Sequence, residues 1–574
     1  MLDGGGGLQV LELDDDIGPG GGGQRRWPAL GVHTTPPAGP GGIRRPGHAM
    51  LLAVSTAAPW GDPERYAGTS MVCSVDALAS RAGIDVLATG GNAVDAAVAA
   101  NAVLTVTTQH MCGIGGDLFA LVHDGDSPPT CLNASGRAGS GADPDRLRAE
   151  GHAGMPRKDD VRAVTVPGCI DGWAALHGRY GALALSDVLA PAIALAEGGF
   201  EASPLLVPAA AEVAGVVGAQ DYDGLEHTGQ VVRRPGVARV LRAFADGGRD
   251  AVYLGEFGEE LLDVGGGEFT EDDLHRSQAD WVEPLGVHAW GHEVWTVPPN
   301  SQGYITLGAA VILDGLDLPR EDDPLRAHLL VEALRQAGHD RPEVLHEDAD
   351  GPALVAPDRL DPRRSAVDPD ARALLGDAWH DGDTMYECVV DGDGLAVSLI
   401  QSNADGFGSH VTLPGLGVFL HNRGMGFRLE SGHPARYGPG RRPPHTLAPA
   451  LVTRPDGSLR AVLGTMGADA QPQVVLQMLV RLLHDGAGPG HAVGGGRWVL
   501  SGPSAFDAWE DPDGAEVLLE AHAPEGWVPG LVARGHVARV GAANFGHAHC
   551  IEMVDGGLAG AADPRAVVGE AAGA

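Results

Sequence analysis

The stretch DGDTMYECVVDGDGLAVSLIQSNADGFGSH, residues 381–410, decides the fold. Two runs in it, Thr384–Val390 and Leu395–Gln401, are rich in Val, Leu and Ile, as is typical of strands. Between them lies Asp391-Gly392-Asp393-Gly394, a turn sequence of the kind that closes a β-hairpin. The stretch therefore predicts a hairpin whose first strand begins at Thr384.

Thr384 directly follows the acidic, Gly-containing sequence Asp381-Gly382-Asp383. If the 383–384 peptide bond is cut, this threonine carries a hydroxyl and a free α-amine. The ordinary pKa of such an amine is roughly 7.7–8, so part of it is neutral near pH 7 and can take the hydroxyl proton. One residue would then supply both nucleophile and base. A threonine at the start of a strand is also a common β-branched sheet residue, so the run alone leaves both interpretations open.

A series of ordered motifs resembles the γ-glutamyltransferase family. The order T-x-Y-x-x-V-V-D-x-D-G-x-A-V-S-L-x-Q-S-N, followed by Gly406-Phe407-Gly408-Ser409, resembles the site at which these N-terminal-nucleophile hydrolases cut themselves. The resemblance spans roughly residues 68–565. Further motifs occur in the family's order: GGNAVDAAVAA (90–100), CGIGGDLF (112–119), VPG (166–168), NRG (422–424), RRPPHTLAP (441–449), GTMGADAQPQ (464–473) and DPR (563–565).

The resemblance implies an α/β (α+β) fold, a four-layer αββα sandwich with two stacked antiparallel sheets. It also implies a precursor that is cut into a large subunit, residues 66–383, and a small subunit, residues 384–574. Residues 1–65 contain Gly/Pro-rich tracts and are expected to be a disordered leader, either dispensable or upstream of the true start. The charged, Pro- and Asp-rich segment 321–377 is expected to be a flexible linker ahead of the cut.

The resemblance also assigns catalytic roles. Thr384 is the nucleophile, Asp383 supplies the carbonyl of the bond that is cut, and Ser402 supports the nucleophile's amine. Gly467 and Ala468 stand where the family usually has two glycines, whose backbone N–H groups stabilise an oxyanion. The N–H survives in alanine, but its Cβ is expected to crowd a turn with positive φ.

Four residues are expected to bind substrate. Arg137 is expected to hold a carboxylate through a bidentate guanidinium contact, although Ser135 occupies the position where the family's arginine is usual. The other three are Asn403, His445 and Thr446.

The predicted pocket departs from the best-known transpeptidases. Gly426 stands where they carry an Asp that binds the glutamyl α-ammonium, and Ala404 replaces an Asn. His445 and Thr446 replace paired serines. Recognition of an α-amino acid head is therefore incomplete, and these changes resemble a divergent branch that includes cephalosporin-acylase-like members.

The sequence thus predicts a self-processing N-terminal-threonine amidohydrolase that cleaves γ-glutamyl amides such as glutathione, with transfer to water or an amine. One alternative is a glutaryl or cephalosporin acylase-like amidase. A second is a processed but catalytically silent binding or scaffold homologue. The motif G-x-S-x-G does not occur, which disfavours a serine hydrolase of that type.

Composition excludes several other classes. With 39 basic and 76 acidic residues the net charge is −37, which disfavours a nucleic-acid partner. No apolar run reaches the ~18 residues of a membrane span, so no membrane partner is expected. The acidic N-terminus lacks the basic region of a signal peptide, so a cytoplasmic protein is expected. His547 and His549 lack a third ligand, so neither a metal nor a cofactor is expected. The six scattered cysteines are expected to be reduced and mostly buried.

Overall fold

The computed structural model describes residues 59–125, 128–375, 383–502, 508–509, 513–542 and 545–574, and for Asp383 and Thr384 it describes the backbone. The expected leader therefore lies outside the described residues up to position 58. Glu64 and Arg65, which the sequence analysis assigns to that leader, form the first half of strand β1. The described residues belong to one compact unit, Val54–Ala574.

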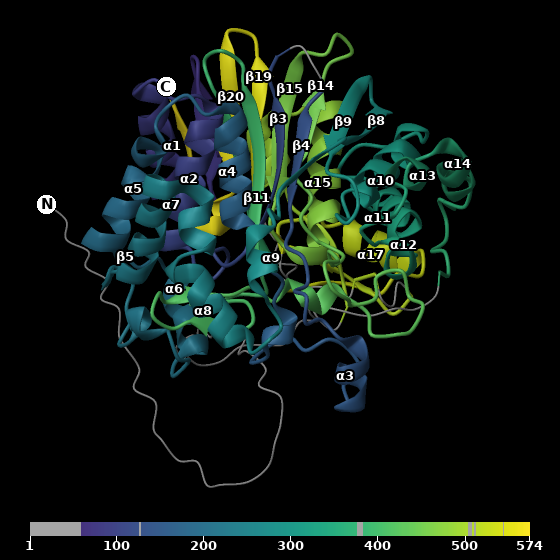
Figure 1. Cartoon of the computed structure of the whole chain (residues 1–574). Coiled ribbons are helices and arrows are strands. Elements are labelled where there is room, and N and C mark those ends of the chain that lie inside the picture. Colours follow the sequence, from purple (N-terminus) through teal and green to yellow (C-terminus); the bar gives the residue numbers. More distant parts are fainter. Residues whose placement is uncertain (1–58, 126–127, 376–382, 503–507, 510–512, 543–544) are drawn as a thin grey trace, which may run out of the picture. The chain divides into compact units, whose positions relative to one another are not determined.

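Two seven-stranded antiparallel sheets form the centre of this unit (Figure 1). We call them the catalytic sheet and the second sheet. The catalytic sheet runs in the order β21 (Glu570–Gly573), β2 (Met71–Ser74), β10 (Asp383–Val390), β11 (Ala396–Ala404), β3 (Asp117–His123), β4 (Thr130–Ala134), β7 (Asp280–Val282). The second sheet runs in the order β1 (Glu64–Ala67), β20 (Gly557–Ala562), β19 (Ala548–Val554), β15 (Leu459–Thr465), β14 (Ala450–Thr453), β9 (His292–Thr296), β8 (Leu285–Ala289).

The two sheets face each other across an apolar core. Phe119, Tyr386 and Ile400 of the catalytic sheet pack in one cluster with Val462 and Ile551 of the second sheet. Because side chains alternate along a strand, the opposite face of each sheet needs its own cover. Helices supply that cover on both sides, which gives the four layers αββα that the resemblance implied and confirms that expectation.

Helices on the outer face of the catalytic sheet lie to the left in Figure 1. They are α1 (Ala77–Ala88), α2 (Ala93–Thr107), α4 (Cys169–Tyr180), α5 (Leu185–Gly198), α7 (Pro235–Tyr253) and α8 (Glu256–Gly265). Helices on the outer face of the second sheet are α10 (Tyr304–Asp314), α11 (Pro324–Gly338), α15 (Gln471–Leu479), α16 (Pro489–Gly494) and α17 (Trp527–Ala533).

Shorter elements complete the described chain. The helices among them are α3 (Pro144–Ala149), α6 (Leu206–Ala210), α9 (Glu271–His275), α12 (Arg341–Val344), α13 (Gly351–Leu354) and α14 (Pro357–Ser365). The strands are β5 (Phe200–Glu201), β6 (Val231–Val232), β12 (Thr412–Leu413), β13 (Val418–Phe419), β16 (Trp498–Ser501), β17 (Glu516–Leu519) and β18 (Ala538–Val540).

The predicted hairpin is confirmed as β10 and β11. Asp391 closes its turn, because one carboxylate oxygen accepts hydrogen bonds from the backbone N–H groups of Asp393 and Leu395, both at 3.0 Å. The other oxygen accepts from Ala93 N–H at 2.8 Å, at the N-terminus of α2. Asn92 caps the same helix, whose residues are all buried. The hairpin is thereby fixed to a buried helix.

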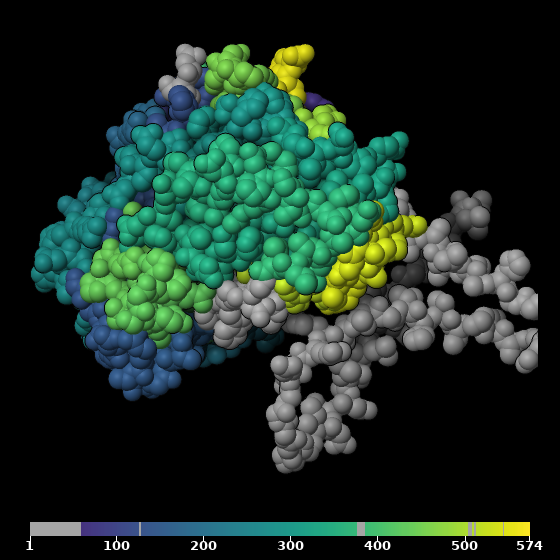
Figure 2. Space-filling view, turned by 90° about the vertical axis from the view of Figure 1, so that its right-hand side faces the viewer, coloured from purple at the N-terminus to yellow at the C-terminus, as the bar shows by residue number. Residues whose placement is uncertain are grey.

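The expectation of a flexible linker at 321–377 is wrong for its described residues. Helices α11 to α14 lie in it, and Figure 2 shows this teal-to-green part of the chain in the middle of one face. The Asp and Pro content reflects helix starts: Asp323 accepts a hydrogen bond from Leu325 N–H, and Pro324 and Pro357 occupy first turns. Composition alone could not distinguish capping from flexibility.

Met71–Ser74 is a short apolar run directly before the first helix, α1. These four buried residues form β2, between β21 and β10, and the helix begins at Ala77. A short apolar run fits a central strand as well as a helix.

All six cysteines are buried and free, as expected. Within the described part of the chain, no helix combines the length and apolarity that crossing a membrane requires.

Candidate active site

The pairing of β10 with β11 places Thr384 beside Ser402 and Asn403. Asp383 pairs with Ala404 and Met385 pairs with Gln401, so two residues of β11 lie opposite Thr384. Such a β-bulge bends the strand and is frequent next to active sites, where it redirects side chains. The backbone thus brings the start of β10 to the end of β11.

Ser402 is buried at this bulge, and its hydroxyl accepts a hydrogen bond from Ala404 N–H at 2.7 Å. Ala404 has φ of 76°, in the left-handed region that alanine rarely adopts. On its other side Ser402 pairs with Asp117 of β3. The predicted amine-supporting hydroxyl therefore sits on a backbone held by strands on both sides.

Asp117 is a fully buried carboxylate in contact with His445. Its Oδ2 lies 3.0 Å from His445 Nε2, and its Oδ1 accepts from Gly136 N–H at 3.0 Å. Burial opposes its ionisation, but His421 and His445 beside it keep the pKa of the carboxyl below its usual value.

His445 is neutral at physiological pH, because burial and the nearby Arg423 lower its pKa to about 3. Its Nδ1 accepts a hydrogen bond from Leu447 N–H at 3.3 Å, which assigns the proton to Nε2, facing Asp117. His445 is thus held as a donor to Asp117 Oδ2.

Thr446 and Ala468 are joined by Gln302, whose side-chain amide donates to the carbonyl oxygens of both, at 3.1 and 3.0 Å. Ala468 has φ of 53° and Gly467 has φ of 125°. The turn does adopt positive φ, as the sequence analysis expected, and the alanine is strained there by roughly 1–2 kcal/mol. Strain of this kind gathers at functional sites.

Ala404, Met425 and Ala468 pack against one another in a small buried cluster. They come from the end of β11, from the 3₁₀ helix η4 (Arg423–Gly426) and from the Gly467–Ala468 turn. This contact unites three segments that are distant in the sequence.

Arg423, at the start of η4, is the residue that sequence reasoning missed. Its guanidinium donates to Thr446 Oγ1 at 3.1 Å and to Ser402 Oγ at 3.5 Å. Burial lowers its pKa to about 10, so it remains a cation at neutral pH. Arg423 belongs to the NRG motif, and the signal that marks it as part of the site is its burial, which depends on tertiary packing.

Arg137 lies in a different arrangement from the one expected. Its guanidinium is ion-paired with Asp280 and reaches Gln278 Oε1 at 3.5 Å. Asp280 also accepts from Arg442 at 2.8 Å. Partial burial opposes ionisation of Asp280, but both arginines hold its pKa below the usual value. The carboxylate-binding role of Arg137 therefore stays a prediction.

Asn403 directs its side-chain N–H to the carbonyl oxygen of Gln109 at 2.8 Å, and its buried Oδ1 has no hydrogen-bond partner among the residues that the structure describes. Its backbone contacts Met111 and Asn422. The Asn403 side chain thus holds the backbone at Gln109, and its role in substrate binding also stays a prediction.

Most of the predicted residues gather at the end of β11, where Asn403 lies and where Asp383 pairs with Ala404. Ser402, His445 and Thr446 are joined through Asp117 and Arg423, Ala468 through Gln302, and Thr384 through the strand pairing. Among the residues that the structure describes, no group of three or more His, Cys, Asp or Glu side chains could hold a metal ion.

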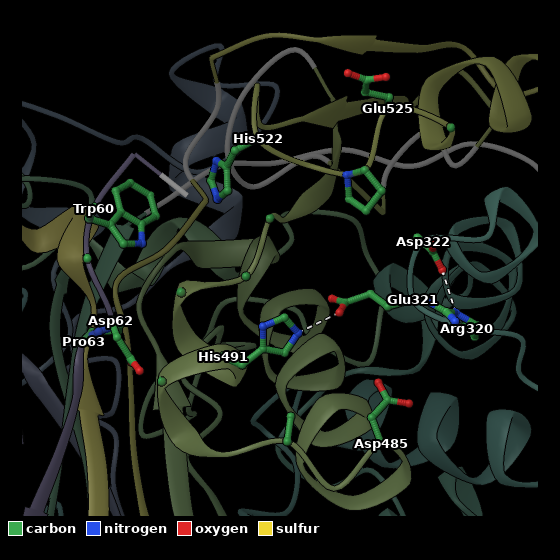
Figure 3. A pocket seen from close by; sticks show the side chains of 18 residues that line it. Trp60, Asp62, Pro63, Arg320, Glu321, Asp322, Asp485, His491, His522 and Glu525 are labelled. Atoms are coloured by element: carbon green, nitrogen blue, oxygen red, sulfur yellow. Dashed lines mark hydrogen bonds and ion pairs between the residues drawn. The ribbon is translucent and has the colours of Figure 1, made fainter. Parts of the chain in front are cut away.

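A cavity of about 980 Å³ lies away from these residues, and none of the predicted site residues lines it. Figure 3 shows Trp60, Glu321, His491 and His522 around it. Glu321 accepts hydrogen bonds from His491 and Arg481, both at 2.7 Å.

Comparisons with known proteins point in one direction. Residues 79–573 match the family profile described as Gamma-glutamyltranspeptidase. The "Glutathione hydrolase-like YwrD proenzyme" of Bacillus subtilis is 34% identical over 522 residues, which cover 86% of this chain and 97% of that protein. The "Oxamate amidohydrolase proenzyme" of Klebsiella pneumoniae is 33% identical over 517 residues, covering 85% of this chain and 95% of that one.

Among solved structures, the cephalosporin acylase from Bacillus halodurans superposes with a TM-score of 0.82 at 32% identity. The superposition covers 92% of this chain and 99% of that structure. The likeness thus extends across both sheets and both helical layers.

Proposed function

The chain belongs to the gamma-glutamyltranspeptidase family and is an amidohydrolase of the N-terminal-nucleophile class, and we propose that Thr384 is its nucleophile after self-cleavage of the Asp383–Thr384 bond. The observation that carries this proposal is the bulge that sets Thr384 opposite Ser402 and Asn403. Two relatives are described as proenzymes, which supports a precursor that is processed.

Self-cleavage begins when the Thr384 hydroxyl oxygen attacks the carbonyl carbon of Asp383. The C–N bond breaks as the acyl group moves from nitrogen to oxygen, and water then hydrolyses the ester. This step leaves a carboxylate on Asp383 and frees the Thr384 amine. Ser402 Oγ is buried beside the bulge and, in this proposal, positions that amine.

In turnover the free amine accepts the hydroxyl proton while the oxygen attacks the substrate's amide carbon. The oxyanion that forms needs donors, and the Gly467–Ala468 turn offers backbone N–H groups in a strained, fixed conformation. The protonated amine passes its proton to the leaving amine, and an acyl-enzyme ester remains. Water or an amine takes the acyl group and restores the threonine.

The substrate we propose is a small amide whose acyl part carries a carboxylate. Glutathione and oxamate, which the relatives' names print, both contain a free carboxylate in addition to an amide. A buried cation, Arg423, lies between Ser402 and Thr446. The γ-glutamyl amides expected from the sequence belong to this class, as do glutaryl amides.

Two assays on one preparation test the proposal. Denaturing gel electrophoresis should show two polypeptides for the wild type and one for Thr384→Ala, with the exposed Thr228→Ala as matched control giving two. Chromogenic γ-glutamyl and glutaryl anilides should then release dye with the wild type. Complete cleavage with no release from either anilide would favour the silent homologue, and an uncut wild type would refute the proposal.

A further inference from the structure

Residues 368–375, which we call the arm, are the last described residues before the proposed cut. The arm follows α14, and its described residues form neither a helix nor a strand of either sheet. Each of them is exposed or half-buried. A surface segment of this kind is usually among the least stable parts of a fold. The arm is instead tied to the protein by side chains that are deeply buried.

An ion pair on α11 holds the middle of the arm. Glu332 and Arg335 form this pair, and their side chains are 0% and 1% exposed. Glu332 Oε2 accepts a hydrogen bond from Ala373 N–H at 3.0 Å. Arg335 donates to the carbonyl oxygen of Ala373, also at 3.0 Å. One buried pair thus satisfies both backbone groups of a single arm residue.

Asp513 extends this hold to the end of the arm. Its two carboxylate oxygens accept from Leu375 N–H at 2.9 and 2.8 Å. Oδ1 also accepts from Arg335 at 2.9 Å. We call Glu332, Arg335 and Asp513 the anchor, and it fixes the chain as far as Leu375.

His328, also on α11, holds the beginning of the arm. Its Nε2 lies 2.7 Å from the carbonyl oxygen of Asp368, so Nε2 carries a proton. Its Nδ1 then accepts from His536 Nε2 at 2.9 Å. Burial lowers the pKa of both histidines, to about 3 for His536. Buried charges and imidazoles therefore hold the arm along its length, an arrangement that is expensive to build.

The anchor sets the length of the loop that has to close at the cut. Strand pairing fixes Asp383 at one end of this loop, and the anchor fixes Leu375 at the other, with seven residues (376–382) between them. Without the anchor the loop would reach back to the end of α14 at Ser365 and contain 17 residues, 366–382. Because the entropic cost of closure rises with the logarithm of loop length, the longer loop places Asp383 in the sheet about fourfold less often.

We propose that the anchor positions the chain for self-cleavage, by holding the arm so that the Asp383–Thr384 bond is kept in the catalytic sheet. This inference rests on the proposed function, because it requires a cut at that bond. The anchor residues act through the arm and are positioning residues. Once the bond is cut the loop no longer has to close, so the anchor governs the rate of processing and not the turnover of the processed protein.

The rate of self-cleavage tests the anchor. Uncut chain is labelled in a short pulse of cell-free translation, and its decay is followed on a denaturing gel. The variant Glu332→Gln/Arg335→Met removes both charges of the pair together, so neither is left unpaired. Its uncut chain should decay about fourfold more slowly than that of the wild type.

Arg326→Met/Asp485→Asn is the matched control. Arg326 lies on the same helix, α11, its side chain is 2% exposed, and it is ion-paired with Asp485. Its other hydrogen bond goes to the carbonyl oxygen of Pro319 and not to the arm. This variant should be processed at the wild-type rate, and slowing equal to that of the anchor variant would contradict the proposal.

Loop length gives a second test that leaves the anchor intact. Ten Gly and Ser residues inserted after Gly376 lengthen the loop of the wild type from seven to 17 residues and should slow cleavage by the same factor of about four. In the anchor variant the insertion lengthens the loop from 17 to 27 residues and should slow cleavage only about twofold further. If the anchor variant fails to fold, the insertion into the wild type decides alone.

Turnover separates positioning from a general loss of structure. For each variant, kcat/KM of fully cleaved protein for the chromogenic anilides should equal that of the wild type. Cleavage at the wild-type rate in the anchor variant or in the insertion variant overturns the role of the anchor, as does an equal loss of turnover and cleavage, and the nucleophile is then unaffected. An uncut wild type overturns the proposed function itself.

Discussion

The end of β11 and the cavity of Figure 3 differ in how their charged groups are held. Around the cavity, Arg320 and Asp322 pair at 3.2 Å with side chains 89% and 70% exposed. At the end of β11, Asp117, Arg423 and His445 are buried and share hydrogen bonds with neighbouring backbone and hydroxyl groups. Exposed pairs contribute little, whereas buried ones are expensive and persist where a task requires them. A cavity of about 980 Å³ is therefore not by itself the stronger functional signal.

The largest expected effect is the loss of cleavage and turnover when Thr384, at the start of β10, is replaced. Thr384→Ala should leave an uncut precursor without measurable turnover, since nucleophile and base are lost together. Thr384→Ser keeps the hydroxyl and should process slowly, over hours on a denaturing gel. Turnover by Thr384→Ala equal to that of the wild type would remove β10 from the site.

Asp117→Asn should reveal the cost of a buried carboxylate. The change removes the negative charge between His445 and His421, and loss of one partner of a buried charged network costs about 3–5 kcal/mol. Urea unfolding measures this loss. Asp322→Asn, the same change at the cavity, should cost no more than about 1 kcal/mol. Equal losses for the two variants would contradict the comparison.

The stability of the buried site should depend on pH. The folded-state pKa of His445 is about 3, below its unfolded value of 6.5, so the unfolded chain binds the extra proton between these values. Stability is then present above pH 6.5 and lost as the pH falls toward 3, by up to about 1.4 kcal/mol per pH unit.

Other buried histidines with strongly lowered pKa values add to the same slope: His110, His536, His547 and His549. His445→Gln, which keeps a donor but cannot titrate, should make the slope shallower by about one proton. Urea midpoints at several pH values measure it, and an unchanged slope would mean that His445 is not the neutral donor described here.

Arg137→Ala should have the smallest effect. Its guanidinium is already paired with Asp280, so the KM for glutaryl anilide should rise by no more than about fivefold. A larger rise, confined to carboxylate-bearing substrates, would restore Arg137 as the carboxylate ligand that the resemblance suggested.

The central hairpin could be predicted because its signal is local. Asp391 and the two glycines of the turn carry the necessary geometry in four residues, and the flanking runs have strand composition. The helices at 324–365 could not, because Asp and Pro favour both linkers and helix starts. Packing of this segment against the helical layer of the second sheet decides whether its Asp and Pro residues lie in a linker or at the starts of helices.

The motifs placed Ser402, Thr446 and Ala468 among the candidate residues, and these lie around Arg423 and Gln302 in the structure. The positive φ of Ala468 matches the expected turn, while the catalytic and binding roles of these residues stay predictions. Arg423 was not predicted as a site residue, because an arginine in a Gly-containing turn usually lies in solvent. Its burial depends on segments that are far apart in the sequence. Arg137 is the opposite case: it was predicted to bind substrate, and the sequence of its loop could not reveal that it pairs with Asp280.

The intact mass of the purified wild-type protein tests the central claim most directly. The account predicts two polypeptides whose masses place the break between Asp383 and Thr384, with an unmodified threonine amine at the start of the smaller one. A single folded polypeptide that spans this bond would contradict it, because no N-terminal threonine would then exist to act as nucleophile and base.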